Sequence, residues 1–320
     1  MTQYSLPIID ISPFVSSSSD PAEKRSCAEA IHTACRDVGF FYLVGHGVPT
    51  ELNEEVLKVA REFFERPEEE KLAIGIEKND NARGYQKLGQ NITKGRKDYH
   101  EGIDLYRPVE PDHVLVKKGL PIRGANLWPT QPASFRPTFE VYIERMLALG
   151  AVVMRAIALG LGLEETFFDS CVDKSFWVMR AIGYPPLQDA NDRDVGVSCG
   201  EHTDYGCLTL LLQDSTPGAL QVRTKQGDWI QANPVPGAYV VNIGDMLNVW
   251  TNDLYQSTLH RVIHRGQCYR VSVPFFFEPN FHARVEPIAK CIGDKERKYD
   301  AVVYGEHLLR KVMNNFTLEL

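Results

Sequence analysis

The sequence lacks the features that mark several large classes of protein. None of its seven cysteines forms a Cys-x-x-Cys pair and their number is odd, so reduced thiols in the cytosol are the simplest interpretation. No run of about 18 apolar residues occurs. The N-terminus, MTQYSLPIIDIS, has neither the basic start nor the apolar core of a signal peptide. We therefore expect a cytoplasmic protein without a membrane segment.

A basic surface is also missing. The formal net charge is −7, the pI is near 5.8, and no run of Lys and Arg occurs. This balance argues against a nucleic-acid binder that depends on a basic surface. Low-complexity stretches are absent and 43% of the residues are hydrophobic, so 320 residues can build a substantial core.

The stretch with the clearest chemistry is CGEHTDYG, residues 199–206. His202 and Asp204 lie two positions apart, so in an extended backbone their side chains point to the same face. A second imidazole from a neighbouring strand would complete two histidines and one carboxylate, a set that suits non-haem Fe(II) with open positions. In isolation, the His-x-Asp pattern is more typical of a histidine that donates to an aspartate at a strand end.

Two segments downstream favour the metal site. STLHRVIH supplies His260 in a β-branched stretch, and YRVSVPFFF places Arg270 and Ser272 on one face of a strand. A guanidinium is a planar fork for a carboxylate, and a serine hydroxyl adds a donor. His264 shares a face with His260 but lies roughly 13 Å along a straight strand, so the two cannot bind one metal together. The sequence therefore predicts a metal triad followed by a carboxylate-binding pair.

At these residues the chain resembles a known family. HTDYG, LHRV and the RVS of YRVSVPFF are similar to motifs of the Fe(II)- and 2-oxoglutarate-dependent dioxygenases of the isopenicillin N synthase-like group. LPIIDIS, DVGFFYLVGHGVP, RGY, NLWP and GYPP follow in the order expected for that family. LHRV matches the family at His260, which favours this residue over His264 as the third ligand.

The resemblance implies a set of roles. His202, Asp204 and His260 would hold Fe(II), and Arg270 and Ser272 would bind the far carboxylate of 2-oxoglutarate. O2 would take the metal position that the three side chains and 2-oxoglutarate leave open. A small organic metabolite would be hydroxylated or desaturated, with release of succinate and CO2. The resemblance implies Tyr184 as a further cosubstrate contact, although many relatives carry Asn in place of Ile182. Strand alternation puts Arg180 on the same face as Tyr184, so we expect Arg180 to contact the cosubstrate as well. Substrate-pocket candidates, each of which could equally be a packing residue, are Arg83, Tyr85, Tyr205, Leu211, Val262 and Phe277.

Other activities remain open at this point. Isopenicillin N synthase and the plant enzyme that makes ethylene from a cyclopropane amino acid share the triad and an Arg-x-Ser pair, yet use no 2-oxoglutarate. The microbial enzymes that make ethylene from 2-oxoglutarate also look similar at MRAIGYPP and FFFEPNF. A jelly-roll binding module with a vestigial site is the non-enzymatic alternative.

The pattern of elements predicts a mainly β fold with a helical N-terminal part. Helical spacing begins at Pro21 and at Thr50, and the longest helix is expected over residues 135–161. With the resemblance, these features predict a double-stranded β-helix (jelly-roll) core braced by α-helices. We expect a monomer with one domain over 1–320: mostly helical to 175, jelly roll over 176–285 and a C-terminal helix over 286–320. Strands are expected at 6–11, 40–44, 176–184, 207–213, 219–223, 229–231, 238–243, 257–264 and 269–277.

Overall fold

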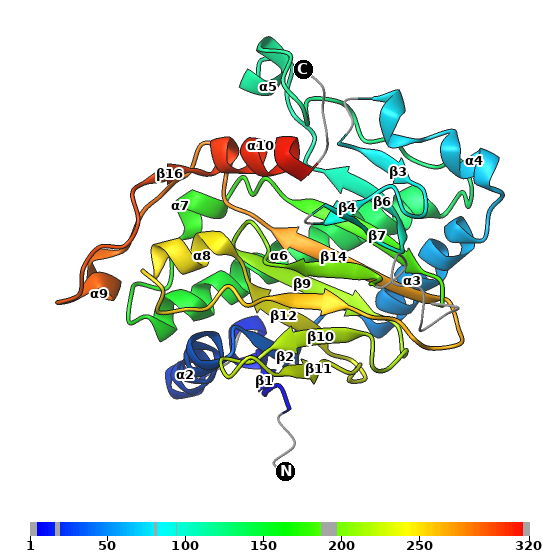
Figure 1. Ribbon diagram of the computed structural model, residues 1–320. Coiled ribbons are helices and arrows are strands. Elements are labelled where there is room, and N and C mark those ends of the chain that lie inside the picture. Colours follow the sequence, from blue (N-terminus) through cyan, green and yellow to red (C-terminus); the bar gives the residue numbers. More distant parts are fainter. Residues whose placement is uncertain (1–4, 17–19, 80–81, 94, 187–196, 316–320) are drawn as a thin grey trace.

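Two β-sheets form the centre of the molecule (Figure 1). The computed structural model describes residues 5–16, 20–79, 82–93, 95–186 and 197–315. The larger sheet has the strand order β1 (Ile8–Asp10), β2 (Phe40–Val44), β12 (Tyr239–Ile243), β9 (Leu208–Gln213), β14 (Arg270–Phe277), β7 (Val178–Tyr184), β6 (Glu101–Tyr106) and β3 (Gly84–Gln86). The smaller sheet has the order β11 (Trp229–Gln231), β10 (Leu220–Arg223), β13 (His260–Val262) and β8 (Cys199–His202).

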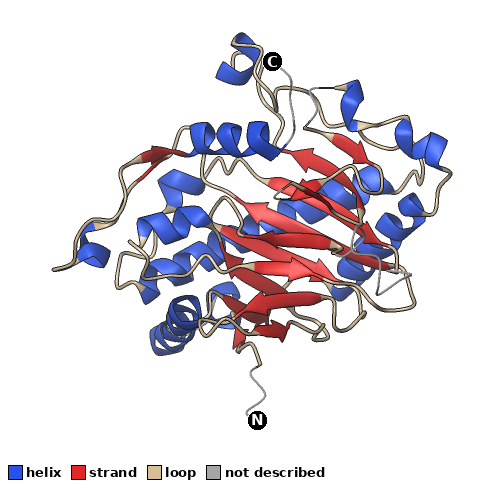
Figure 2. Ribbon diagram, viewed as in Figure 1, coloured by secondary structure: helices blue, strands red, loops and turns tan. Residues whose placement is uncertain are grey.

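Three long helices, α2 (Pro21–Asp37), α3 (Thr50–Phe64) and α6 (Phe135–Gly160), cover the side of the large sheet that faces away from the small one, and shorter helices lie around the sheets (Figures 1 and 2). The shorter helices in the described ranges are α1 (Ser12–Val15), α4 (Glu68–Leu72), α5 (Val114–Lys117), α7 (Asp169–Val172), α8 (Asp245–Trp250), α9 (Ala289–Ile292) and α10 (Tyr304–Asn315). α6 packs against α2, α3 and β14 and buries the predicted apolar stripe. None of the helices in the described ranges is long and apolar enough to cross a membrane.

Two apolar clusters reflect this layering. The larger cluster joins α2, α3 and α6 to the large sheet. The smaller one joins residues of β2, β7 and β12 to residues of β8, β10 and β13, and so fills the space between the two sheets. This arrangement is the jelly roll that the strand pattern predicted, with the helices packed against its outer face.

The N-terminal half contributes strands to the same large sheet. β2 pairs with β12, β3 pairs with β6, and β6 pairs with β7. Two-stranded ribbons are formed by β4 (Ile92–Thr93) with β5 (Arg96–Lys97) and by β15 (Arg284–Val285) with β16 (Val302–Val303). A short 3₁₀ helix spans Ile76–Lys78.

The structure departs from the predicted elements in three places. The strand expected over 257–264 is regular only at β13, because side chains bond the flanking backbone: Asn248 accepts from Ser257 N and Ser198 accepts from His264 N. Residues 245–250, for which no helix is predicted, form α8. The last residues form a helix only from Tyr304, after α9 and β16.

Phe277 belongs to the core and not to a substrate pocket. It is 1% exposed and packs against Gly150 of α6, whereas the neighbouring Phe276 faces the space between the sheets. Strand alternation accounts for this difference, because Phe276 shares the face of Arg270 and Ser272 and Phe277 does not.

We predict that Gly150→Ala destabilises the fold. A Cβ at this position would meet the Phe277 ring at Cδ2 and Cγ, closer than packing allows, so the gain in helix propensity is outweighed by an overpacking cost of roughly 1–3 kcal/mol. Urea unfolding measures the change. Glu144→Ala, on the exposed face of α6, is the control and is expected to change stability by less than about 0.5 kcal/mol. A Gly150→Ala protein as stable as the parent would contradict this packing.

Candidate metal centre and adjoining cavities

His202, Asp204 and His260 come together at the edge of the small sheet. His202 and His260 are direct partners across β8 and β13, and Asp204 follows the end of β8. Asp204 Oδ1 lies 3.7 Å from the Nε2 atom of each histidine. The three possible ligand atoms all lie within 4.8 Å of one another. The structure thus brings the predicted triad together.

Each imidazole is held so that Nε2 is the free ring atom. His202 Nδ1 lies 2.8 Å from Gly200 O, and His260 Nδ1 lies 3.1 Å from Thr258 O. A carbonyl can only accept, so Nδ1 carries the proton and Nε2 keeps its lone pair for a metal. Burial and the neighbouring His202 ring also lower the pKa of His260 to about 4, which keeps this imidazole neutral.

The Asp204 carboxylate is fixed through its other oxygen. Asn242 Nδ2 donates to Oδ2 over 2.7 Å, and Thr209 Oγ1 donates to the same atom. Burial alone would raise the pKa of Asp204, but the hydrogen bonds from Asn242 and Thr209 counter this rise, and the pKa lies below its ordinary value. Oδ1 is therefore an ionised oxygen directed at the histidines, and the donor set fits Fe(II).

Arg270 and Ser272 lie on the facing large sheet. Arg270 is 1% exposed, and its guanidinium contacts Gln213 Oε1 (3.2 Å), Ser272 Oγ (3.4 Å) and the ring of Tyr184 (4.9 Å to the centroid). No carboxylate of the described residues pairs with it, and its Nε atom has no partner. A buried, uncompensated cation is costly, so this site is suited to a carboxylate ligand. Burial raises the pKa of Tyr184 to about 12, which leaves its hydroxyl protonated beside the same site.

Two cavities meet at the metal triad, and we name them by their lining. The inner cavity, of about 550 Å³, reaches from His202, Asp204 and His260 to Arg270 and Ser272. The outer cavity, of about 730 Å³, extends from the triad towards α10. The inner cavity is also lined by Tyr184, Leu211 and Val262, and the outer cavity by Tyr205, Asp104 and Glu278.

Arg180 and Phe276 line both cavities. Arg180 was expected to contact the cosubstrate, but its Nε atom donates to Asp104 Oδ1 over 2.6 Å, across the β6–β7 pairing. Arg180 thus stands between the two cavities as half of a buried ion pair. Asp104, Phe276 and Glu278 are missed by motif reasoning, although the strand parity of Arg270 and Ser272 could have indicated Phe276 and Glu278.

Two predicted pocket residues lie elsewhere. Arg83 is fully buried and donates to the carbonyl oxygens of Tyr106, Arg107 and Ile122 and to Asn126 Oδ1, at 2.7–2.9 Å. Through these four acceptors, Arg83 holds the chain segments that carry them together. Neither cavity includes Arg83, so it gives no support for an acidic substrate.

Tyr85 is likewise a core residue. Its hydroxyl donates to Glu101 Oε2 over 2.6 Å, and Lys71 donates to the same oxygen over 2.6 Å. Tyr269 donates to Glu101 Oε1 over 2.7 Å. The aromatic side chain of Tyr85 is therefore committed to a buried network under β6.

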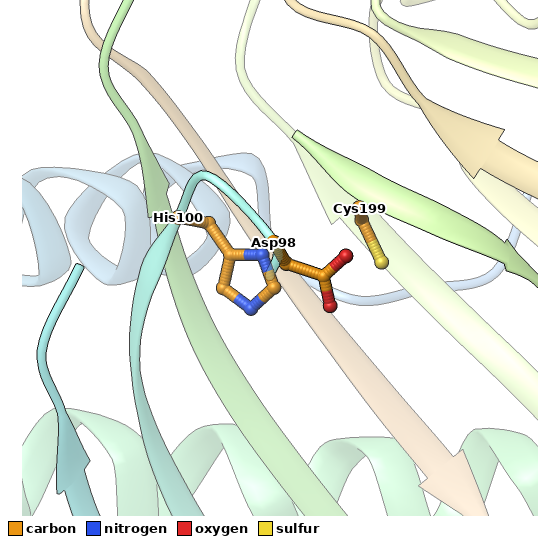
Figure 3. Close-up of side chains that lie close together, drawn as sticks. All are labelled: Asp98, His100 and Cys199. Atoms are coloured by element: carbon orange, nitrogen blue, oxygen red, sulfur yellow. The ribbon is translucent and has the colours of Figure 1, made fainter. Parts of the chain in front are cut away.

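A second group of potential ligands, Asp98, His100 and Cys199, lies beside the inner cavity (Figure 3). Asp98 Oδ2 accepts from Asn91 and Thr93, its Oδ1 accepts from Gly200 N at 2.9 Å, and His100 Nδ1 bonds Ser198 O at 2.7 Å. Because both Asp98 oxygens already accept from donors, the group anchors β8 instead of offering an open metal site.

Comparison with known proteins decides among the activities. A model of the N-terminal region of non-haem dioxygenases in morphine synthesis matches residues 6–131, and a model of the 2OG-Fe(II) oxygenase superfamily matches residues 174–279. A homoarginine-6-hydroxylase of Oryza sativa subsp. japonica is 46% identical over 98% of both chains. The chain belongs to the 2OG-Fe(II) oxygenase superfamily.

Further relatives agree with this assignment. A homoarginine-6-hydroxylase of Glycine max is 47% identical over 98% of this chain and 97% of its own. The solved structure of a full-length Neurospora crassa protein in complex with alpha-KG and thymine superposes with a TM-score of 0.85, at 31% identity over 97% of each chain. Alpha-KG is 2-oxoglutarate. The protein is thus an Fe(II)- and 2-oxoglutarate-dependent dioxygenase that acts on a small molecule by hydroxylation, and the alternatives of a 2-oxoglutarate-independent oxidase or a binding module are not supported.

We predict that Asn242→Ala weakens Fe(II) binding about 10- to 100-fold, because Asp204 loses a donor that fixes its orientation. Anaerobic titration with Fe(II) gives the Kd. Asn53→Ala is the matched control, because it removes an amide that accepts a hydrogen bond from Tyr239 and makes no contact with the metal triad of this oxygenase. Its Fe(II) affinity is expected to be unchanged. Equal affinity in parent and Asn242→Ala would show that Asp204 does not depend on this bond.

Arg270→Met tests the carboxylate site of the oxygenase. Loss of charge-assisted hydrogen bonds worth roughly 1.5–3 kcal/mol should weaken 2-oxoglutarate binding about 10- to 100-fold. 2-Oxopentanoate, which lacks the far carboxylate, serves as the control ligand, and its affinity should stay nearly constant. A variant that loses affinity for both keto acids equally would show that Arg270 acts on the fold and not on that carboxylate.

Proposed function

We propose that this dioxygenase hydroxylates a small basic amino acid of the homoarginine type. Four relatives named homoarginine-6-hydroxylase, from rice, soybean and Arabidopsis thaliana, match 97–98% of the chain at 44–47% identity. The observation that carries the proposal is the charge of the outer cavity, whose wall includes Asp104 and Glu278 beside the metal triad.

The charge balance of the outer cavity favours a cation. Asp104 is neutralised by Arg180, the only Lys or Arg among the described residues of the cavity wall. Glu278 has no such cationic partner there, and Asp204 serves the metal. A cationic substrate group would therefore find a partly desolvated carboxyl group that can ionise to pair with it, and an acidic substrate would not.

We propose that His202, Asp204 and His260 hold the iron. When bound, Fe(II) supplies the oxygen activation that lets 2-oxoglutarate be oxidised together with a substrate C–H bond. The three side chains contribute a fixed face of ligands: each Nδ1–H is held by a backbone carbonyl and Asp204 Oδ2 is held by Asn242 and Thr209. This fixed face leaves the opposite side open towards both cavities.

Arg270, Ser272 and Tyr184 are proposed to bind the far carboxylate of 2-oxoglutarate. Leu211 and Val262, which line the inner cavity, would contact its carbon chain and exclude water. Tyr205 and Phe276, which line the outer cavity, would bracket the substrate beside the metal. Of the predicted substrate residues, Tyr205 alone lines the outer cavity.

We also propose that residues 1–320 act as one domain in a monomeric, cytoplasmic enzyme. Support comes from the shared large sheet, in which β2 of the N-terminal half pairs with β12 of the C-terminal half. All seven cysteines are free thiols, in keeping with a reducing compartment. Size-exclusion chromatography with light scattering should give a mass near 36.1 kDa, and a dimer mass would contradict the monomer.

We predict that homoarginine stimulates succinate formation by the Fe(II)-loaded enzyme. Mass spectrometry should show that the homoarginine product has gained one oxygen atom. Arginine and lysine test the length and shape of the basic side chain, and thymine represents a neutral heterocycle. Asp204→Ala is the inactive control, because it removes a proposed metal ligand. Turnover of thymine without turnover of any basic amino acid would refute the proposal.

A further inference from the structure

Two buried polar atoms, on residues that line the outer cavity, have no hydrogen-bond partner among the residues that the structure describes. They are Nη2 of Arg180 and Oε2 of Glu278. Buried charged groups normally have partners, and exceptions often mark places where a ligand completes the bonding. Both residues line the same cavity beside His202 and Asp204.

Glu278 is a built feature of the cavity. It follows the last residue of β14, is 3% exposed, and its backbone N–H donates to Ser175 Oγ over 3.1 Å. Its carboxylate occupies the space that a side chain at position 206 would need, so Gly206 makes room for it directly after the metal motif. Burial raises the pKa of Glu278 to about 8, the Tyr304 hydroxyl offsets part of this rise, and the carboxylates of Asp204 and Asp245 add to it. A bound cation would stabilise the ionised form.

Arg180 has bonding capacity left over. Its Nε atom is bonded to Asp104 Oδ1 at 2.6 Å, which fixes the plane of the guanidinium. The free Nη2 group lies on the wall shared by the two cavities. A guanidinium has five N–H donors, so it can hold Asp104 and a ligand carboxylate together.

We infer that the substrate is bound at two opposite charges, with its carboxylate on Arg180 and its basic side-chain group on Glu278. This inference rests on the proposed function and deepens it, because it assigns a specificity residue to each end of a basic amino acid. A neutral heterocycle would leave Glu278 unmatched, and a simple amine would leave Arg180 Nη2 unmatched.

The test of Glu278 uses Glu278→Gln with two ligands that differ in charge. Homoarginine carries a guanidinium, and homocitrulline carries the uncharged ureido group of nearly the same shape. Loss of a charge-assisted pair should weaken homoarginine binding about 10- to 100-fold and change homocitrulline binding by less than about threefold. Binding is measured by anaerobic titration of the Fe(II)–2-oxoglutarate enzyme, and KM and kcat are measured separately in air.

The test of Arg180 uses Arg180→Lys, which keeps a cation for Asp104 but removes the second donor. Homoarginine binding should weaken about tenfold, whereas its decarboxylated analogue, which has no carboxylate, should bind the variant and the parent alike. Glu54→Gln, a change at an exposed carboxylate of α3, is the matched control and should leave every ligand unaffected.

The outcomes separate the inference from the proposed function. One outcome is that the parent enzyme hydroxylates homoarginine while Glu278→Gln weakens the binding of homoarginine and homocitrulline equally, or weakens the binding of neither ligand. In that case the assignment of Glu278 is wrong and the proposed function stands. If the parent enzyme binds no basic amino acid, the proposed function itself fails. Unchanged 2-oxoglutarate affinity and an unchanged or higher unfolding temperature show that Glu278→Gln is folded, since the variant removes a buried ionisable carboxyl.

Discussion

The pairing of β8 with β13 is the constraint on which the site depends. It sets His202 opposite His260, and each imidazole is oriented by a carbonyl two residues earlier in the chain. The third ligand, Asp204, is fixed from the other sheet, because Thr209 belongs to β9 and Asn242 to β12. The metal centre therefore bridges both layers of the jelly roll. A shift of either sheet would displace one ligand relative to the other two, which explains why a rigid double-layered scaffold suits an open metal site.

β14 organises the two cavities along one strand. Residues at even positions face the space between the sheets: Arg270 and Ser272 lie at the closed end of the inner cavity, Phe276 lies where the cavities meet, and Glu278 lies in the outer cavity. Successive even positions are roughly 6.6 Å apart along a strand. A cationic, an apolar and an acidic side chain therefore follow each other along the line on which the two proposed ligands would lie. The odd positions, among them Phe277, pack against the helices and so fix the distance between the strand and the helical layer. One strand thus serves the core with one face and both ligands with the other.

The sequence predicted the residues whose chemistry is local and missed those whose role depends on tertiary contacts. Spacing alone indicated the shared face of His202 and Asp204, and the structure places both beside His260. Nothing in the local sequence indicates that Arg83 is enclosed by four backbone and amide oxygens, since these come from residues 23 to 43 positions away. The role of Asn242 is hidden in the local sequence for the same reason, because its partner Asp204 lies 38 positions earlier. Phe277, however, was a misjudged strand parity that the positions of Arg270 and Ser272 already contradicted.

Under the proposed function, charged groups in the adjoining cavities would also sort the two ligands. 2-Oxoglutarate is a dianion, and the outer cavity would set it against Glu278, whereas the inner cavity offers the buried guanidinium of Arg270. A basic substrate meets the reverse situation, because Arg270 repels it from the inner cavity. Discrimination between the two ligands would therefore come from repulsion in the wrong cavity as well as from attraction in the right one. Arg180 fits this division because its pairing with Asp104 neutralises the boundary, so that a carboxylate can be held there without drawing the cosubstrate out of the inner cavity.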